Sequence, residues 1–211
     1  MLEYSSITLA FIFTALINPH PNISLISDAI ITSKMPKKIC IIKEKSIWQK
    51  FYNKSRNLNL RYTLRKEAKT MSKDVINKAV MSLHCAKKYH IEHRPILTVI
   101  DYSLPSSRKR LWVFDLEQGK LLYHTYVSHG ISSGSLLTNH FSNRNNSKAT
   151  SMGVYLTEKA YFGREGMSMR LTGIDSKFNN NATNRYIVMH GGWYMDPKFI
   201  EQYGRSGRSW G

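Results

Sequence analysis

The spacing of apolar residues divides the chain into a helical part followed by a strand-rich part. In the first part, apolar side chains recur at three- and four-residue steps and form one stripe, made of Val75, Ile76, Ala79, Val80 and Leu83. This spacing predicts an amphipathic helix, and residues 34–89 read as mostly helical. Few apolar anchors lie between residues 34 and 70, so that stretch is either a linker or an arm on a charged surface.

After Pro95 the pattern changes to short runs rich in β-branched and aromatic residues. These runs predict strands over residues 96–102, 110–116, 121–127, 153–157, 168–173 and 185–190. The tight connection at residues 117–120 predicts that the second and third of these strands form a hairpin. Long polar loops at residues 132–147 and 179–181 separate the others, so we expect a β-rich domain whose loops carry the function.

The first apolar segment, residues 7–17, allows two interpretations. Eleven mostly apolar residues ended by a Pro-containing turn match the central part of a secretory signal. Its flanks fit that interpretation badly, because Glu3 precedes it without any Lys or Arg, and no clear cleavage site follows. The alternative is a buried amino-terminal helix, and no apolar run reaches the ~20 residues of a membrane span.

Charge sets the chain apart from an ordinary globular protein. The 211 residues hold 31 Lys and Arg against 14 Asp and Glu, a net charge of +17. Residues 34–94 hold 17 against 4 (+13), whereas residues 95–211 hold 14 against 8 (+6). Such a balance favours anionic partners such as nucleic acid, lipid head groups or a polyanionic wall polymer. Apolar content of 42% excludes disorder of the whole chain.

The two cysteines, Cys40 and Cys85, are too few for a disulfide scaffold and lack the spacing of a zinc module. Cys85 has His84, His90 and His93 close by in sequence, but on a helix these positions do not share one face. We therefore expect ordinary surface histidines and a small buried cysteine there. A Cys40–Cys85 disulfide remains open if the protein is exported.

Eight short strings occur in order along the second half of the chain. They are DYSLPS (101–106), RLWVFDL (110–116), VSHG (127–130), FSN (141–143), SMGVY (151–155), MRLTG (169–173), IVMHG (187–191) and GRSWG (207–211). Together they resemble the murein L,D-transpeptidase (YkuD-like) catalytic domain family over roughly residues 75–211. The resemblance implies an α+β, mainly β fold. It divides the chain into an apolar segment (1–33), a basic helical region (34–94) and a catalytic domain (95–211).

The chemistry implied by this resemblance is cysteine acyl transfer on peptidoglycan stem peptides, without a cofactor or a metal, in the periplasm or cell envelope. His190 would be the base that activates the cysteine, and its ring would be oriented by an acceptor that the sequence does not identify. The stretch with Ser209 and Gly211 matches the approach to the nucleophile, where backbone N–H groups can face the developing oxyanion.

The sequence departs from the family pattern at its end. The family's cysteine directly follows the glycine that matches Gly211, and the sequence stops there. We expect this chain, as given, to lack the nucleophile and the last part of the domain, and to be inactive or a truncated copy.

Substrate contacts are expected from six residues: His129, Tyr155, Arg170, Gly191, Trp193 and Trp210. His129 either lines the cleft or belongs to loop structure. Arg170 either meets a substrate carboxylate or lies on a solvated strand face. Trp193 either walls the substrate groove or is part of the core.

Two other functions compete with catalysis. A non-catalytic wall-binding protein would keep the groove without the thiol and hold anionic polymer with its basic half. Nucleic-acid binding is the more distant alternative, because residues 34–94 contain no recognised motif and few aromatic platforms for bases.

Overall fold

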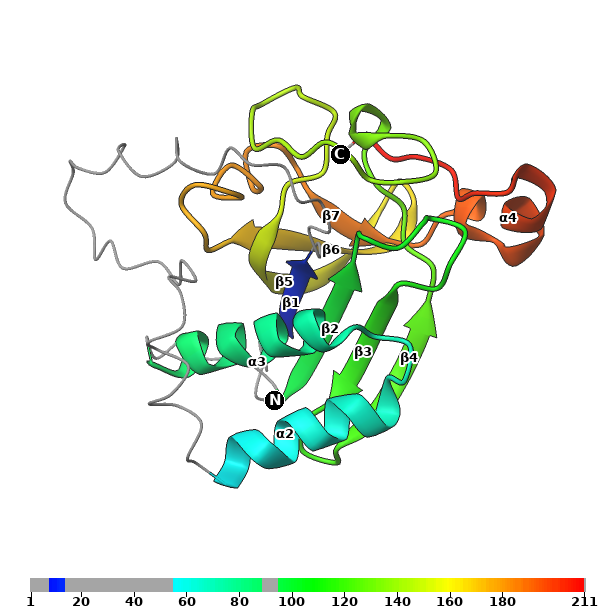
Figure 1. Cartoon of the computed structure of the whole chain (residues 1–211). Helices are drawn as coiled ribbons and strands as arrows, with labels where there is room; N and C mark the ends of the chain where they lie inside the picture. The colour runs from blue at the N-terminus through cyan, green and yellow to red at the C-terminus, as the bar shows by residue number, and fades with distance from the viewer. Residues whose placement is uncertain (1–7, 14–54, 89–94, 211) are drawn as a thin grey trace, which may run out of the picture.

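The computed structural model describes residues 8–13, 55–88 and 95–210 of the chain (Figure 1). Seven strands form one sheet in the order β4-β3-β2-β1-β5-β6-β7. β1 runs parallel to β2, and all other neighbouring strands are antiparallel. The strands are β1 (Thr8–Phe13), β2 (Ile96–Asp101), β3 (Leu111–Asp115), β4 (Lys120–Thr125), β5 (Gly153–Gly163), β6 (Gly166–Gly173) and β7 (Val188–His190).

Two long helices, α2 (Ser55–Glu67) and α3 (Lys73–Lys88), lie against the same face of the sheet (Figure 1). Ser72 marks the start of α3, because its hydroxyl accepts a hydrogen bond from the Val75 amide at 3.2 Å. A short helix, α4 (Pro197–Tyr203), stands apart from them at the far side of the molecule (Figure 1). The 3-10 turns η1 (Ile131–Ser133) and η2 (Trp193–Met195) lie in the loops.

Successive side chains of each strand point to opposite faces of the sheet, so an apolar core forms on each face. On the helix side, Leu97, Val99, Trp112 and Phe114 pack with the apolar stripe of α3 and with Leu64 of α2. On the opposite side, a second cluster unites strand residues with residues of the loops: Ile100, Tyr102, Leu111, Tyr155, Leu171 and Ala182. The first core therefore lies between the helices and the sheet, and the second lies between the sheet and the loops.

Most predicted elements are confirmed. The mixed helix-and-sheet class, the helical stripe at residues 75–83 and the β3–β4 hairpin are all present. β5 and β6 extend beyond their predicted ends, to Gly163 and back to Gly166, because they form a continuous hairpin. α4, with Asp196 as its N-cap, was not predicted.

The buried helix, one of the two interpretations of residues 7–17, is wrong, because residues 8–13 form the central strand β1. Periodicity does not separate a strand from a helix in a short apolar run, and the β-branched and aromatic residues of TLAFIF favour a strand. No helix in the described ranges is long and apolar enough to cross a membrane. Cys40, His90, His93 and Gly211 lie outside the described residues.

Phe114 lies in the core between the helices and the sheet, so we expect its truncation to lower the stability of the fold strongly. Its side chain is fully buried between the helices and the sheet, so Phe114→Ala should lower the free energy of unfolding by about 3–5 kcal/mol. The matched control is Phe162→Ala on β5, where 82% of the residue is exposed and a change within about 0.5 kcal/mol is expected. Urea unfolding measures both, and equal effects would contradict this arrangement of the core.

Candidate active site

The GRSWG stretch lies beside the loop that follows β4. Ser209 forms a parallel bridge with Gly130, in which the Ser209 amide donates to the His129 carbonyl at 2.9 Å. The Ile131 amide in turn donates to the Ser209 carbonyl at 2.8 Å. The Ser128 hydroxyl adds a bond to the Gly207 carbonyl at 2.8 Å. These bonds hold the last described residues in an extended conformation against the 128–131 segment (Figure 1).

On its other side the same stretch contacts η2. The Gly207 amide donates to the Tyr194 carbonyl at 2.9 Å. A Cβ on Gly207 would lie 2.5 Å from the Tyr194 Cβ, so the approach requires glycine. The stretch is therefore fixed between two loops that are distant in sequence.

Trp210 ends the described part of this stretch and is 73% exposed. The Lys148 ammonium lies 4.3 Å from the centre of the indole ring, a cation–π contact. Lys148 has a left-handed backbone with a φ of 54°, and its carbonyl accepts from the Ser132 amide at 3.0 Å. Lys148 thus connects the polar 132–148 loop to the stretch. No sequence motif indicates this role.

His190 lies at the end of β7 and is partly exposed. Its Nδ1 is 2.6 Å from the Gly191 carbonyl oxygen, which is the acceptor that the sequence could not identify. With the proton on Nδ1, the lone pair is on Nε2, the arrangement that a general base needs. The neighbouring Gly191 is exposed, and a Cβ on it would meet no atom within 4 Å.

Three predicted substrate residues lie at the surface. Arg170 of β6 is exposed, and its guanidinium lies 5.5 Å from the centre of the Tyr161 ring. Trp193 in η2 is 73% exposed, which excludes the alternative that it belongs to the core. Trp210 is described above, so all three leave side-chain surface accessible to a ligand.

The other two aromatic or imidazole candidates, Tyr155 and His129, are interior residues. Tyr155 is fully buried, and its hydroxyl oxygen is 2.6 Å from the Ser151 hydroxyl. His129 is only 1% exposed. Neither side chain offers surface to a substrate, so the structure corrects this part of the prediction and assigns both residues to the fold. Their strings in the sequence carry no signal that separates burial from binding.

His129 is held by a buried arginine that the sequence analysis missed. The Arg110 guanidinium is fully buried and donates to the carbonyls of Val127 and Leu104 and to the Thr138 hydroxyl. Its Nη2 is also 2.9 Å from His129 Nδ1, which must act as the acceptor because a guanidinium only donates. The His129 Nε2–H can then donate to the Gly134 carbonyl at 3.2 Å.

Burial sets the protonation of this pair. Burial, and to a lesser extent the Arg110 charge, lowers the pKa of His129 to about 4. Burial also lowers the pKa of Arg110 to about 10, so the guanidinium stays charged at neutral pH. At neutral pH the uncharged His129 ring therefore accepts a hydrogen bond from the charged Arg110 guanidinium. The His129 carbonyl is the group that binds the Ser209 amide.

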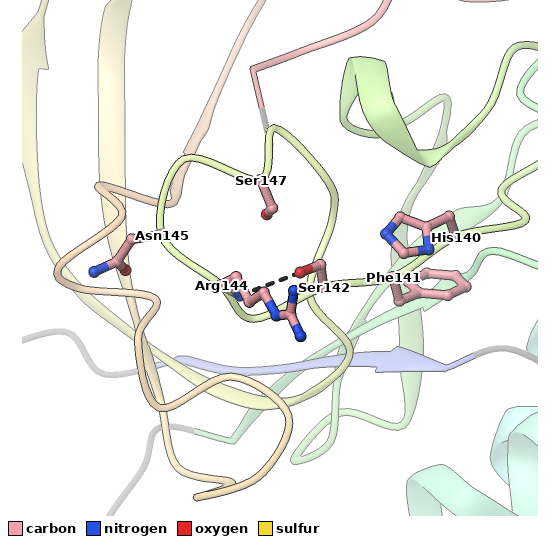
Figure 2. Close-up of a pocket in the computed structure, with 6 residues that line it drawn as sticks. All are labelled: His140, Phe141, Ser142, Arg144, Asn145 and Ser147. Atoms are coloured by element: carbon pink, nitrogen blue, oxygen red, sulfur yellow. Dashed lines mark hydrogen bonds between the residues drawn. The ribbon is translucent and has the colours of Figure 1, made fainter.

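The 140–147 loop encloses a pocket of about 550 Å³ (Figure 2). Its lining consists of His140, Phe141, Ser142, Arg144, Asn145 and Ser147 and contains no acidic side chain. Figure 2 shows Ser147 pointing across the loop toward the side that carries Ser142 and Arg144. The Arg185 guanidinium fixes this loop from outside, because it donates to the Ser142 carbonyl at 2.6 Å and to the Ala149 carbonyl.

Comparison with protein families identifies the class of this site. Residues 67–211 match the model of the L,D-transpeptidase catalytic domain, and the chain therefore belongs to that family. The comparison with curated proteins found no match, and neither did the comparison with solved structures. Within the described ranges, no group of three or more His, Cys, Asp or Glu side chains could hold a metal ion.

The lowered pKa of His129 predicts a pH-dependent stability. The unfolded chain protonates this ring near pH 6.5 and the folded chain only near pH 4, so protonation favours the unfolded state between these values. Stability should be full above pH 6.5 and should fall by about 3 kcal/mol as the pH drops to 4. Urea unfolding of His129→Asn should show a flatter pH dependence, whereas the exposed control His140→Asn should keep the wild-type slope. Identical slopes in all three proteins would contradict this assignment.

Replacing glycine by alanine should affect stability differently at Gly207 and at Gly191. Gly207→Ala forces a Cβ against Tyr194 and should lower stability by about 1–3 kcal/mol. Gly191→Ala adds its Cβ to open space and should change stability by less than about 0.5 kcal/mol. Thermal unfolding of both variants provides the comparison. A Gly207→Ala protein as stable as wild type would mean that the stretch does not lie against η2.

Proposed function

We propose that this chain supplies the general base, His190, of a peptidoglycan-modifying cysteine L,D-transpeptidase, whose family pattern places the nucleophilic thiol directly after the glycine that matches Gly211. The observation that carries the proposal is the family match over residues 67–211. In the proposed reaction a thiolate attacks the diaminopimelate carbonyl carbon of a stem peptide, and the bond to D-alanine breaks. D-Alanine leaves with a proton from the imidazolium. An amine of a neighbouring stem then attacks the thioester, gives its proton to His190 and releases the thiolate.

The geometry of His190 supports this role. Its hydrogen bond to the Gly191 carbonyl fixes Nδ1 as the donor, and the side chain is partly exposed. Ser209 contributes through its backbone, because both its N–H and its carbonyl are bonded to the 129–131 segment and hold the stretch in place. Gly211, in the proposal, continues this stretch toward the thiol.

Substrate binding is assigned to the polar loops around the stretch. Stem peptides carry carboxylates, and the 140–147 pocket offers Arg144, hydroxyls and amides without a competing acidic group. Arg170 and Trp210 are accessible for further contacts. The proposed location is the periplasm or cell envelope, where this substrate lies.

We further propose that Cys85 is not the nucleophile. Cys85 belongs to α3, which packs on the helix side of the sheet, whereas Tyr155 and Leu171, under the loops, belong to the core of the opposite side. Peptide mapping of the 211-residue chain after incubation with a carbapenem should therefore show no adduct at Cys85, since carbapenems acylate the catalytic cysteine of this family.

Adding the thiol tests the assignment of His190. A variant with one cysteine appended directly after Gly211 should form the adduct, and an appended serine should not. His190→Gln in the cysteine variant should slow acylation by about 10²–10⁴-fold. His124→Gln, on β4, is the matched control and should leave the rate unchanged. Failure of the cysteine variant to react, or an acylation rate that His190→Gln leaves unchanged, would overturn the assignment.

A non-catalytic wall-binding role is favoured by a separate surface. Four cations near the turn between α2 and α3 are exposed: Arg65, Lys66, Lys69 and Lys73. An anionic wall polymer, or a membrane surface, would bind there through charge, so sedimentation with purified sacculi should be lost as salt rises. Charge reversal at Lys66 and Lys69 should reduce it, whereas absence of binding at low salt would remove this role.

A further inference from the structure

Three aromatic side chains form an exposed row on η2 and α4. Trp193 is 73% exposed and Tyr203 is 55% exposed, while Phe199 lies between them. The Trp193 and Phe199 ring centres are 5.5 Å apart, and those of Phe199 and Tyr203 are 4.4 Å apart. Phe199 and Tyr203 share one face of α4 because they are four residues apart, and Ile200 anchors the other face in the protein. We call these three residues the aromatic row.

The row is rigid although it is exposed. The Trp193 indole has edge-to-face contacts with both Tyr194 and Phe199, which fix its orientation. The Asp196 carboxylate caps α4 by accepting from the Lys198 amide at 2.8 Å, and Gly204 ends the helix with a φ of 67°. Rigid aromatic faces kept in water are suited to binding, because little conformational entropy is lost when a ligand covers them.

The charge around the row is balanced. Between residues 193 and 205, Lys198 and Arg205 are matched by Asp196 and Glu201, whereas the whole chain carries +17. This balance disfavours a polyanion as the ligand. The three side chains also offer at most about 750 Å², less than the ~800 Å² per partner of a standard protein interface. A neutral ligand with flat apolar faces and hydroxyls at its edges fits both constraints, and exposed Glu201 and Gln202 can bond such hydroxyls.

We propose that the aromatic row binds the glycan strand of peptidoglycan by stacking pyranose rings on Trp193 and its neighbours. This inference rests on the proposed function, since stem peptides are attached to amino-sugar chains. The row is continuous with the active-site stretch through the Gly207–Tyr194 hydrogen bond, and Tyr194 directly follows Trp193. A strand on the row would present its stem peptides to the loops around Trp210.

The test uses a peptide-free probe, the β-1,4-linked tetramer of N-acetylglucosamine, titrated into the 211-residue chain by calorimetry. Binding should weaken about tenfold in Trp193→Ala and be retained in Trp193→Phe, which keeps a stacking face. The controls Tyr123→Ala and Phe162→Ala remove aromatics of similar exposure, 66% and 82%, on β4 and β5, and should bind like wild type. Thermal unfolding should be unchanged in all four variants, because all three positions are exposed.

Absence of tetramer binding by the wild-type chain, or equal weakening in the controls, would overturn the inference. A dimer in sedimentation equilibrium that Trp193→Ala dissociates would also overturn it, because the row would then contact a second copy. These results leave the proposed function standing if the cysteine variant still reacts with carbapenem. Failure of that reaction with intact tetramer binding would remove the catalytic proposal instead.

Discussion

The buried contact between Arg110 and His129 supports the arrangement of the whole candidate site. A guanidinium without solvent needs acceptors for its five N–H groups, and here they come from three separate segments: the loop after β2, the end of β4 and the 132–148 loop. The backbone of His129 then receives the Ser209 amide. Because a buried charge with a missing partner is strongly destabilising, these loops have little freedom to separate. The conformation of the GRSWG stretch therefore depends on the buried Arg110 guanidinium, which contacts the stretch only through His129.

Patterns along the chain were sufficient for the elements whose side chains alternate or repeat clearly. The helix α3 could be predicted from its apolar stripe, and the strands β2 to β4 from their β-branched, aromatic and other apolar residues. β1 was not predicted, because a short run of five apolar residues after Thr8 fits a helix, a strand or a signal equally well. α4 has seven residues and owes its ends to Asp196 and Gly204, which are too local to stand out beside the long polar loops.

Short motifs indicated candidate site residues, and the catalytic roles of those residues stay predictions. No motif indicated which of the candidates are buried. His190 and the GRSWG stretch followed from the family resemblance, and Trp193 is exposed as a ligand contact requires. His129 and Tyr155 occur in similar motifs, but tertiary contacts turn them inward. The roles of Arg110 and Lys148 arise from segments that are far apart in sequence, so no local pattern could indicate them.

The place of β1 in the sheet has a consequence for maturation. β1 separates β2 from β5, so it joins two three-stranded halves, β4-β3-β2 and β5-β6-β7. Proteolytic loss of residues 1–33 would leave both halves with an unpaired row of backbone donors and acceptors in the middle of the molecule. A slot of this kind, one strand wide, can be filled only by a segment that pairs parallel to one neighbour and antiparallel to the other. A cleavage that removes residues 8–13 is thus incompatible with the seven-stranded sheet unless another strand, from the same or a different polypeptide, takes the vacated position.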